Sequence, residues 1–353
     1  MSGGRWQING WGVISFVFAR TFRLFTLKPL LGWFRYGFCG LYTTCNGCHI
    51  PIFRYPPPRL IPNNKEKLKM RQGLLTILLA LLACTAQASD ASFSYGKLPR
   101  LGSAIALIYD EQTQQPLYRK NENEVVPIAS ITKLMTAMVI LDARLPLDEP
   151  ITITREDRDR LKGTKSRLRD GMTLSRGDLL ALALMASENR AASALARTFP
   201  GGTPVMVALM NAKARELGMD NSSFAGPVGL QSENVSTARD LVKMVQAAES
   251  YPEIKRATTQ SAHTVQVGAR QTLRFGNTNP LVRSKAWDID LSKTGYISEA
   301  GRCLVMKVRL SDRPTVIVLL DSWGKNTRVG DANRIKHWAE GGARRVSLRS
   351  DMR

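Results

Sequence analysis

Three short motifs place reactive side chains in a fixed order along the chain. Residues 130–133 (SITK) form an S-x-x-K motif, residues 187–189 (SEN) an S-x-N motif, and residues 293–295 (KTG) a K-T-G motif. S-x-x-K also occurs at 94–97 and 322–325, but only the copy at 130–133 opens a stretch that is apolar on nearly every face. Such a stretch is typical of a buried helix. Each motif is weak alone, whereas the three in this order are specific.

The residue types in these motifs suit acyl transfer through a serine nucleophile. A serine hydroxyl needs a base at neutral pH, and Lys133 shares a helix face with Ser130 because the two lie three positions apart. Burial and a neighbouring cation, Lys293, would lower the pKa of Lys133 so that it can act as that base. The helix N-terminus would offer backbone N–H groups to an oxyanion at Ser130. Ser187 could pass a proton to a leaving amine.

The other motif residues suit substrate binding. Asn189 could hold Lys133 and a substrate carbonyl at the same time. Lys293 and Thr294, on an edge strand, could bind a carboxylate, and Gly295 would let a substrate backbone approach that strand closely. Taken singly, these residues could be helix caps, a solvated lysine or a turn glycine. Their combination is what indicates catalysis.

Other kinds of catalytic site find little support in the sequence. Only His263 and His337 lie beyond residue 91, and no G-x-S-x-G occurs, which argues against a Ser-His-Asp triad. There is no H-E-x-x-H or paired-histidine motif, so we expect no metal and no other cofactor. Cys303 opens an apolar strand and is expected in the core.

The elements that must position the motifs are strands near both ends of the body and helices between them. Apolar and β-branched runs predict strands at 103–109, 116–119, 303–310 and 315–320 and a hairpin at 264–275. Helical patterns cover 130–143, 175–186, 190–198, 203–217, 236–250 and 332–340, and we interpret 151–175 as loops and a short helix. This order predicts an α/β domain of the α+β type, an antiparallel β-sheet flanked by helices.

Residues 70–88 have the three parts of a secretory signal peptide. Basic residues run up to Arg71, an apolar stretch follows from Gly73 to Ala83, and the segment ends on two small residues around Gln87. We therefore predict export to the periplasm and cleavage after Ala88. A short buried helix, or a lipoprotein signal with the lipid on Cys84, are the alternatives.

The signal-like segment does not begin the chain. Residues 1–69 are rich in aromatics and arginine, and charged residues interrupt their apolar stretches. We interpret them as a spurious or unstructured N-terminal extension, with Met70 as the true start. The segment 45–49 fits the C-x-x-C-H pattern of haem attachment, but it lies upstream of the export signal, so neither haem nor a zinc site with Cys39 is expected. A single catalytic domain that contains all three motifs would then span 89–341, with a short basic tail at 342–353.

Of the net charge of +21, residues 1–69 carry +9 and residues 70–353 carry +12, and the basic excess of the larger part is spread along it. A nucleic-acid-binding protein would more often carry a basic stripe or a known motif, so nucleic-acid binding is not expected. A basic surface suits an anionic polymer or, at most, peripheral contact with a membrane. No run reaches the roughly 18 apolar residues of a spanning helix.

At the three motifs the chain resembles the low-molecular-mass penicillin-binding proteins, the serine D-alanyl-D-alanine peptidase family. The stretches that carry the resemblance are PIASITKLMTAMVILDARLPLDE (127–149), LALMASENRAASALA (182–196), NAKARELGM (211–219), NVSTARDL (234–241) and LSKTGY (291–296). A second S-x-N motif, at 232–234, falls in the family's structural segment, and we leave it out of the site.

The resemblance implies a β-lactamase/DD-peptidase-like transpeptidase fold and an acyl-enzyme mechanism. Ser130 would attack a D-alanyl peptide bond of peptidoglycan, Lys133 would take its proton, and Ser187 would protonate the departing amine. Backbone N–H groups of Ser130 and Tyr296 would form the oxyanion hole. β-Lactams would acylate the same serine.

Within the family, the resemblance favours a DD-endopeptidase that cleaves cross-links. Glu188 stands where carboxypeptidases usually have glycine, and the second β-domain and C-terminal amphipathic helix of membrane-tethered carboxypeptidases are not expected here. A D-Ala-D-Ala carboxypeptidase is the alternative. A class A β-lactamase would need a deacylating glutamate, and neither Glu233 nor Glu249 lies in an E-x-x-x-N pattern. A non-catalytic wall-binding or β-lactam-sensing module would keep the groove without turnover.

Overall fold

The computed structural model describes residues 97–268 and 270–350, with side chains described as far as residue 341. The chain divides into two compact units, Met1–Ala88 and Ser89–Arg353, and every described residue belongs to the second. The predicted extension at 1–69, the signal peptide at 70–88 and the C-x-x-C-H pattern lie outside the described residues. Within the described part, no helix is long and apolar enough to cross a membrane.

A five-stranded antiparallel sheet forms the frame of the domain, in the order β2-β1-β11-β10-β9. Its strands are β1 (Ser103–Asp110), β2 (Gln115–Lys120), β9 (Ile289–Ile297), β10 (Gly301–Leu310) and β11 (Arg313–Ser322). The central strands β10 and β11 are buried along most of their length, which fits their near-continuous apolar sequences because both faces are covered. The first and last parts of the chain thus pair in one sheet, as the sequence predicts.

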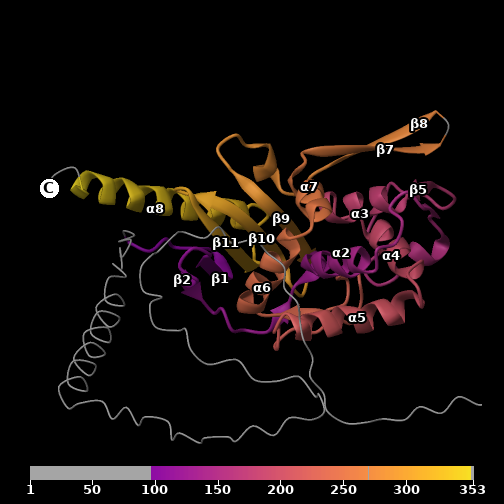
Figure 1. Cartoon of the computed structure of the whole chain (residues 1–353), viewed down its shortest axis with the longest axis horizontal. Coiled ribbons are helices and arrows are strands. Elements are labelled where there is room, and N and C mark those ends of the chain that lie inside the picture. The colour runs from indigo at the N-terminus through magenta and orange to yellow at the C-terminus, as the bar shows by residue number, and fades with distance from the viewer. Residues whose placement is uncertain (1–96, 269, 351–353) are drawn as a thin grey trace, which may run out of the picture. The chain divides into compact units, whose positions relative to one another are not determined.

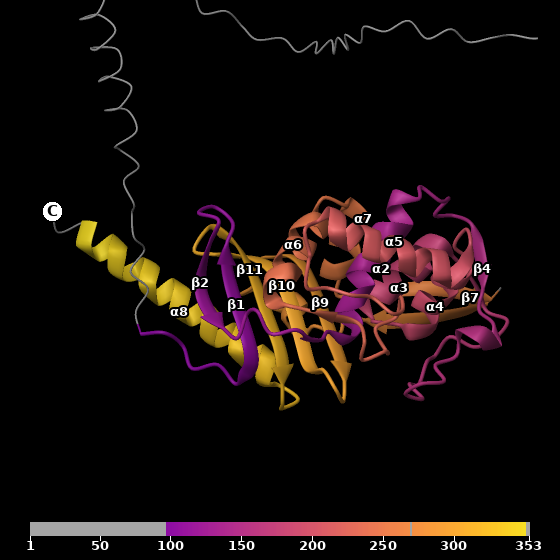
Figure 2. The ribbon, with the colours of Figure 1, turned by 90° about the horizontal axis from the view of Figure 1, so that it is seen from below.

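Different elements cover the two faces of the sheet (Figures 1 and 2). Helix α8 (Thr327–Ser350) packs on one face over a cluster that includes Ile335 and Trp338. The opposite face carries α6 (Ala238–Glu249) and the rest of the helices over the larger core. These remaining helices are α2 (Lys133–Asp142), α3 (Arg176–Met185), α4 (Asn189–Arg197), α5 (Gly202–Glu216) and α7 (Pro252–Thr259).

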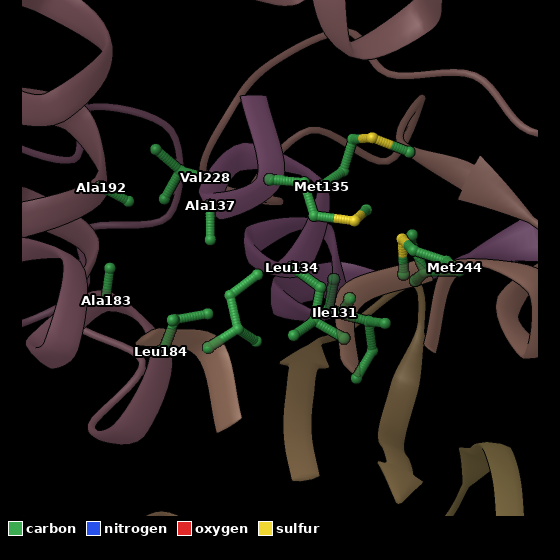
Figure 3. Close-up of a cluster of buried hydrophobic side chains, with 14 of the residues drawn as sticks. Ile131, Leu134, Met135, Ala137, Ala183, Leu184, Ala192, Val228 and Met244 are labelled. Atoms are coloured by element: carbon green, nitrogen blue, oxygen red, sulfur yellow. The ribbon is translucent and has the colours of Figure 1, made fainter. Parts of the chain in front are cut away.

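Helix α2 lies at the centre of the helical layer and is buried on every side. Figure 3 shows Ile131, Leu134, Met135 and Ala137 among side chains of α3, α4 and α6. The helix is preceded by a 3-10 turn, η1 (Ala129–Thr132), so the predicted helix at 130–143 begins as a tighter turn. Because the neighbours of α2 hold it from all directions, the side chains at its start are fixed relative to α3 and α4.

Short β-pairs and two further 3-10 turns complete the fold. The pairs are β3 (Val126–Pro127) with β6 (Val235–Ser236), β4 (Pro150–Thr152) with β5 (Thr173–Ser175), and the hairpin β7 (Ala262–Gly268) with β8 (Gln271–Gly276). The turns are η2 (Arg155–Asp157) and η3 (Pro280–Arg283). The β7–β8 hairpin projects from the helical layer (Figure 1).

Three predicted elements differ from the structure. The segment 151–175 contains β4 and β5 as well as a short helical turn. A helix follows the predicted one at 236–250 and was not itself predicted: α7 begins at Pro252, because proline suits the first helical position. The last helix is longer than the predicted 332–340: it starts at Thr327 and continues to Ser350, into the predicted basic tail.

The central position of α2 makes its apolar side chains decisive for stability. Leu134 is fully buried, so we expect Leu134→Ala to lower the free energy of unfolding by about 2–5 kcal/mol, measured by urea denaturation. Leu209→Ala removes the same atoms from a side chain that is 42% exposed on α5 and is the control. Equal losses in the two variants would contradict this account of the core.

Candidate active site

Ser130 lies in η1, at the junction between the helical layer and the edge of the sheet. It is only 9% exposed, and the residue before it, Ala129, has a left-handed backbone with φ of 48°. Two glycines make room for this turn. A Cβ on Gly229 would lie 2.1 Å from the Ala129 carbonyl oxygen, and one on Gly295 would lie 2.9 Å from the Ile128 oxygen. The sequence therefore needs glycine at both places for the serine to lie between β9 and the segment 225–230.

Lys133 is buried, at 1% exposure, and its amine has three neighbours. Its Nζ lies 2.9 Å from Ser130 Oγ, 2.8 Å from Asn189 Oδ1 and 2.7 Å from the Val228 carbonyl oxygen. A protonated amine donates to all three. A neutral amine keeps two donors for Asn189 and Val228 and has a lone pair left for the Ser130 hydroxyl proton.

Burial lowers the pKa of Lys133 to about 7, while the carboxylates of Glu188 and Asp159 act in the opposite direction. A substantial fraction of the lysine is therefore neutral near pH 7. Burial is the largest cause of the lowered value, and the charges of the two buried lysines repel each other, so the contribution predicted for Lys293 stays a prediction. The repulsion is felt by Lys293, whose pKa is lowered by burial first and then by Lys133 and Arg328.

Ser187 lies in the turn between α3 and α4 and contacts the second buried lysine. Lys293 Nζ donates to Ser187 Oγ over 2.9 Å and to the Thr294 carbonyl oxygen over 2.9 Å. Ser187 has a positive φ of 56°. The following residue, Glu188, caps α4 by accepting from the Arg190 N–H. The cap thus fixes the start of α4 directly behind the serine.

Asn189, the first residue of α4, faces Lys133 with its oxygen and a loop with its nitrogen. Its Nδ2 donates to Thr164 Oγ1 over 2.8 Å. The amide oxygen is held by Lys133, so the amide N–H is the group left for a substrate carbonyl. A cavity of about 240 Å³ lies beside it, lined among others by Asp159, Leu161 and Leu230.

Strand β9 forms the opposite wall, and it is an edge strand as predicted. Thr294 Oγ1 lies 2.7 Å from Thr278 Oγ1, which fixes the hydroxyl, and the Lys293 side chain crosses to Ser187. Tyr296 is 56% exposed, with the Arg302 guanidinium 4.5 Å from its ring centre. The structure therefore brings together every residue that the three motifs supplied, and it places Tyr296 next to them at the end of β9.

Two supporting residues were missed in the sequence. Arg328 of α8 donates through Nη1 to the Gly295 carbonyl over 3.1 Å, while its Nε is buried without a hydrogen-bond partner among the described residues. Asn234, in the second S-x-N motif, makes four hydrogen bonds, to the backbone of Ala225 and Gly226 and to Thr132 Oγ1. It does not reach Ser130, but it holds the segment whose Val228 carbonyl binds Lys133. No sequence motif around Arg328 marks it as part of the site. Asn234 could have been found, because it ends the second S-x-N motif.

Comparison with known proteins agrees with this geometry. Residues 94–324 match the family model described as D-alanyl-D-alanine carboxypeptidase. The chain belongs to this family. It is similar to proteins named D-alanyl-D-alanine endopeptidase from Pseudomonas aeruginosa, with 46% identity over 76% of this chain and 88% of that protein. It is also similar to the one from Escherichia coli, with 44% identity over 78% and 90%. These names confirm the resemblance to the low-molecular-mass penicillin-binding proteins and to the endopeptidase type among them, penicillin-binding protein 7.

Solved structures of the family share the fold. A Streptomyces DD-transpeptidase superposes with a TM-score of 0.64 at 26% identity, covering 69% of this chain and 99% of that one. A Listeria monocytogenes penicillin-binding protein, solved with ampicillin bound, gives 0.60 at 28% identity with the same coverage. The predicted DD-peptidase-like transpeptidase fold is thus confirmed.

The close packing at Gly229 leads to a stability prediction. Alanine there would place its Cβ against the Ala129 carbonyl, at a φ of 79° that disfavours any side chain. We expect Gly229→Ala to lower the free energy of unfolding by about 1–3 kcal/mol in a urea titration. Gly276→Ala, where a Cβ meets nothing within 4 Å, is the matched control. Indistinguishable variants would mean that η1 can shift freely.

Proposed function

We propose that the protein is a serine DD-endopeptidase that hydrolyses D-alanyl bonds in peptidoglycan cross-links through an acyl-enzyme on Ser130. The observation that carries the proposal is the contact between Ser130 Oγ and the buried Lys133 amine at 2.9 Å, with the lysine pKa near 7. A base of that pKa is suited to neutral pH. The endopeptidase names of relatives at 44% and 46% identity support the choice of substrate.

Acylation begins when neutral Lys133 accepts the Ser130 hydroxyl proton. The Oγ then bonds to the D-alanyl carbonyl carbon, and the resulting oxyanion is held by the N–H groups of Ser130 and Tyr296. The carbon–nitrogen bond breaks as Ser187 gives its proton to the leaving amine. Lys293 can replace that proton because its ammonium donates to Ser187 Oγ. Protonation of Lys133 favours this transfer, since its charge lowers the pKa of Lys293.

Water completes the cycle after the amine has left. Lys133 returns its proton to solvent, and Lys293 regains one from solvent. Once neutral, Lys133 can take a proton from a water molecule that attacks the acyl carbon. The ester bond to Ser130 breaks, and the serine recovers its proton. Asn189 would bind the carbonyl of the acyl donor, while Lys293, Thr294 and the charge of Arg328 behind Gly295 would attract a carboxylate of the substrate.

β-Lactamase activity gains no support from the positions of the two glutamates that were considered for it, Glu233 and Glu249. Glu249 pairs with Lys307 and Lys255, away from Ser130. Glu233 accepts a hydrogen bond from the neighbouring Ser232 hydroxyl. Neither contacts Ser130 or Lys133 as a β-lactamase base would. A carboxypeptidase remains the second candidate, because relatives at 26–29% identity bear that name.

We further propose that the exported, periplasmic protein is the part that follows residue 88.

The substrate assignment is tested with residues 89–353, the second compact unit, and a cross-linked muropeptide dimer that carries one pentapeptide stem. We expect mass spectrometry to show conversion of dimer to monomers while the pentapeptide persists, and no conversion by Ser130→Ala. Release of free D-alanine with intact dimer would identify a carboxypeptidase instead. β-Lactam bound to Ser130 with no cleavage of either bond would indicate a sensing or binding module.

The pKa of Lys133 sets the pH dependence of acylation. Only the neutral lysine accepts the serine proton, so the second-order rate of acylation by a β-lactam should rise about tenfold per pH unit below pH 7 and level off above it. Stopped-flow measurement with a chromogenic β-lactam between pH 5 and 9 checks this.

A lysine variant provides the control for this pH profile. Lys133→Arg keeps a cation that stays protonated, and it should lower the rate by about 10²–10⁴ without a rise near pH 7. A flat profile in the unaltered protein would remove Lys133 as the base.

A further inference from the structure

Residues 159–164, on the loop between η2 and β5, are organised around one carboxylate and are here called the strap. Asp159 accepts hydrogen bonds from the backbone N–H groups of Leu161, Lys162 and Thr164, at 2.8, 3.0 and 2.9 Å. It also accepts from the Thr164 hydroxyl at 2.6 Å. Four bonds to a single side chain make the strap a unit that can move as one piece.

The strap occupies one of the two N–H donors of the Asn189 amide, the group that the mechanism reserves for substrate. Asn189 Nδ2 donates to Thr164 Oγ1 over 2.8 Å, and the Thr164 hydroxyl donates onward to Asp159. The donor and acceptor in each of these hydrogen bonds are fixed, because Asn189 uses its oxygen for Lys133 and the Asp159 carboxylate can only accept. The Thr164 oxygen therefore stands in for a substrate carbonyl.

The strap also contacts the opposite wall of the cleft. Lys162 Nζ donates to Glu299 Oε1 in the turn between β9 and β10, and this bond lowers the pKa of Glu299 to about 2. Ser298 Oγ holds the other Glu299 oxygen at 2.8 Å. The strap thus links the Asn189 side of the cleft to the K-T-G strand. The Lys162 and Glu299 side chains are 29% and 42% exposed, and ion pairs this exposed are weak enough to open readily.

The strap is fixed at its ends but not along its length. On one side Asp157 is buried and paired with Arg197, and on the other Leu168 is fully buried. Between them only Asp159 and Ser166 are half-buried, and Leu161 is 62% exposed. The cavity of about 240 Å³ beside Asn189 lies against the strap, so space is available for it to move.

We propose that the strap is a substrate-displaced gate in which Thr164, Lys162 and Glu299 determine which ligands enter the cleft. A substrate carbonyl replaces Thr164 Oγ1 on Asn189, and a branched ligand must also part Lys162 from Glu299. The proposal rests on the proposed function only in that the ligand presents a carbonyl to Asn189. A compact β-lactam needs the first exchange, whereas a cross-linked peptide needs both.

Displacement of the strap would also favour acylation electrostatically. Asp159 is one of the two carboxylates that hold the pKa of Lys133 up against burial. When the strap moves away, this carboxylate moves with it, and the neutral form of the base gains population. Entry of substrate and activation of the base are thereby coupled.

Single substitutions separate the two contacts. Thr164→Val has nearly the same shape but cannot accept from Asn189, so it should raise the second-order rates of both β-lactam acylation and muropeptide cleavage about two- to fivefold. Lys162→Met and Glu299→Gln should raise kcat/KM for the cross-linked muropeptide by a similar factor and leave β-lactam acylation within about twofold. The reversed pair Lys162→Glu with Glu299→Lys should restore the original selectivity.

Matched controls and contrary outcomes complete the test. Lys336→Met and Glu340→Gln break an ion pair of similar exposure on α8, at 2.9 Å, and should change neither rate. Slower acylation by Thr164→Val would mean that the strap positions Asn189 for catalysis. Unchanged rates in Thr164→Val, Lys162→Met and Glu299→Gln would mean that the strap is not a gate. Either result overturns the proposal. If the unaltered protein cleaves only a pentapeptide, the endopeptidase assignment fails, and the rates of Thr164→Val with a β-lactam and with the pentapeptide still decide whether the strap must leave Asn189.

Discussion

The burial of one amine, that of Lys133, imposes the arrangement of the rest of the site. An amine withdrawn from water must have its hydrogen bonds replaced by the protein. The three acceptors come from parts of the chain far apart in sequence: Ser130 in η1, Asn189 at the start of α4, and the Val228 carbonyl in the segment 225–230. α2 must therefore be enclosed by other elements, because only an enclosed helix can bring its first residue into contact with all three.

The surroundings of Lys133 follow from that requirement. Gly229 and Gly295 have no side chain because the segments that contain them approach the turn at Ser130 from opposite sides. Asn234 is buried because the segment that presents the Val228 carbonyl has no strand or helix of its own to hold it in place. A second buried lysine, Lys293, then makes the cleft electrostatically unfavourable for two full charges. This repulsion is useful in acyl transfer, since a proton gained by one lysine is readily lost by the other.

The sequence predicted the parts of this arrangement that depend on local spacing. The pairing of Ser130 with Lys133 follows from helical periodicity, and Lys293 and Thr294 were expected on an edge strand, where they lie. The Val228 carbonyl could not be predicted, because a backbone oxygen leaves no trace in residue type. Arg328 was missed for a related reason: its place below Gly295 depends on how α8 crosses the sheet. The start of α8 at Thr327 lies in a polar stretch that helical patterning alone does not mark.

The catalytic centre by itself does not explain a preference between an endopeptidase and a carboxypeptidase, since both reactions attack a D-alanyl carbonyl with the same serine and lysine. Glu188, which suggested the endopeptidase in the sequence, is 8% exposed and caps α4, so its structural role is to fix Asn189. The difference must come from the groups that decide how much of a ligand fits beyond the reacting bond. In the described part of the chain, Thr164 and Lys162 contact the two walls of the cleft through a loop that is exposed over most of its length. Selectivity can therefore change by substitution on the strap without disturbing the buried lysine on which the reaction depends.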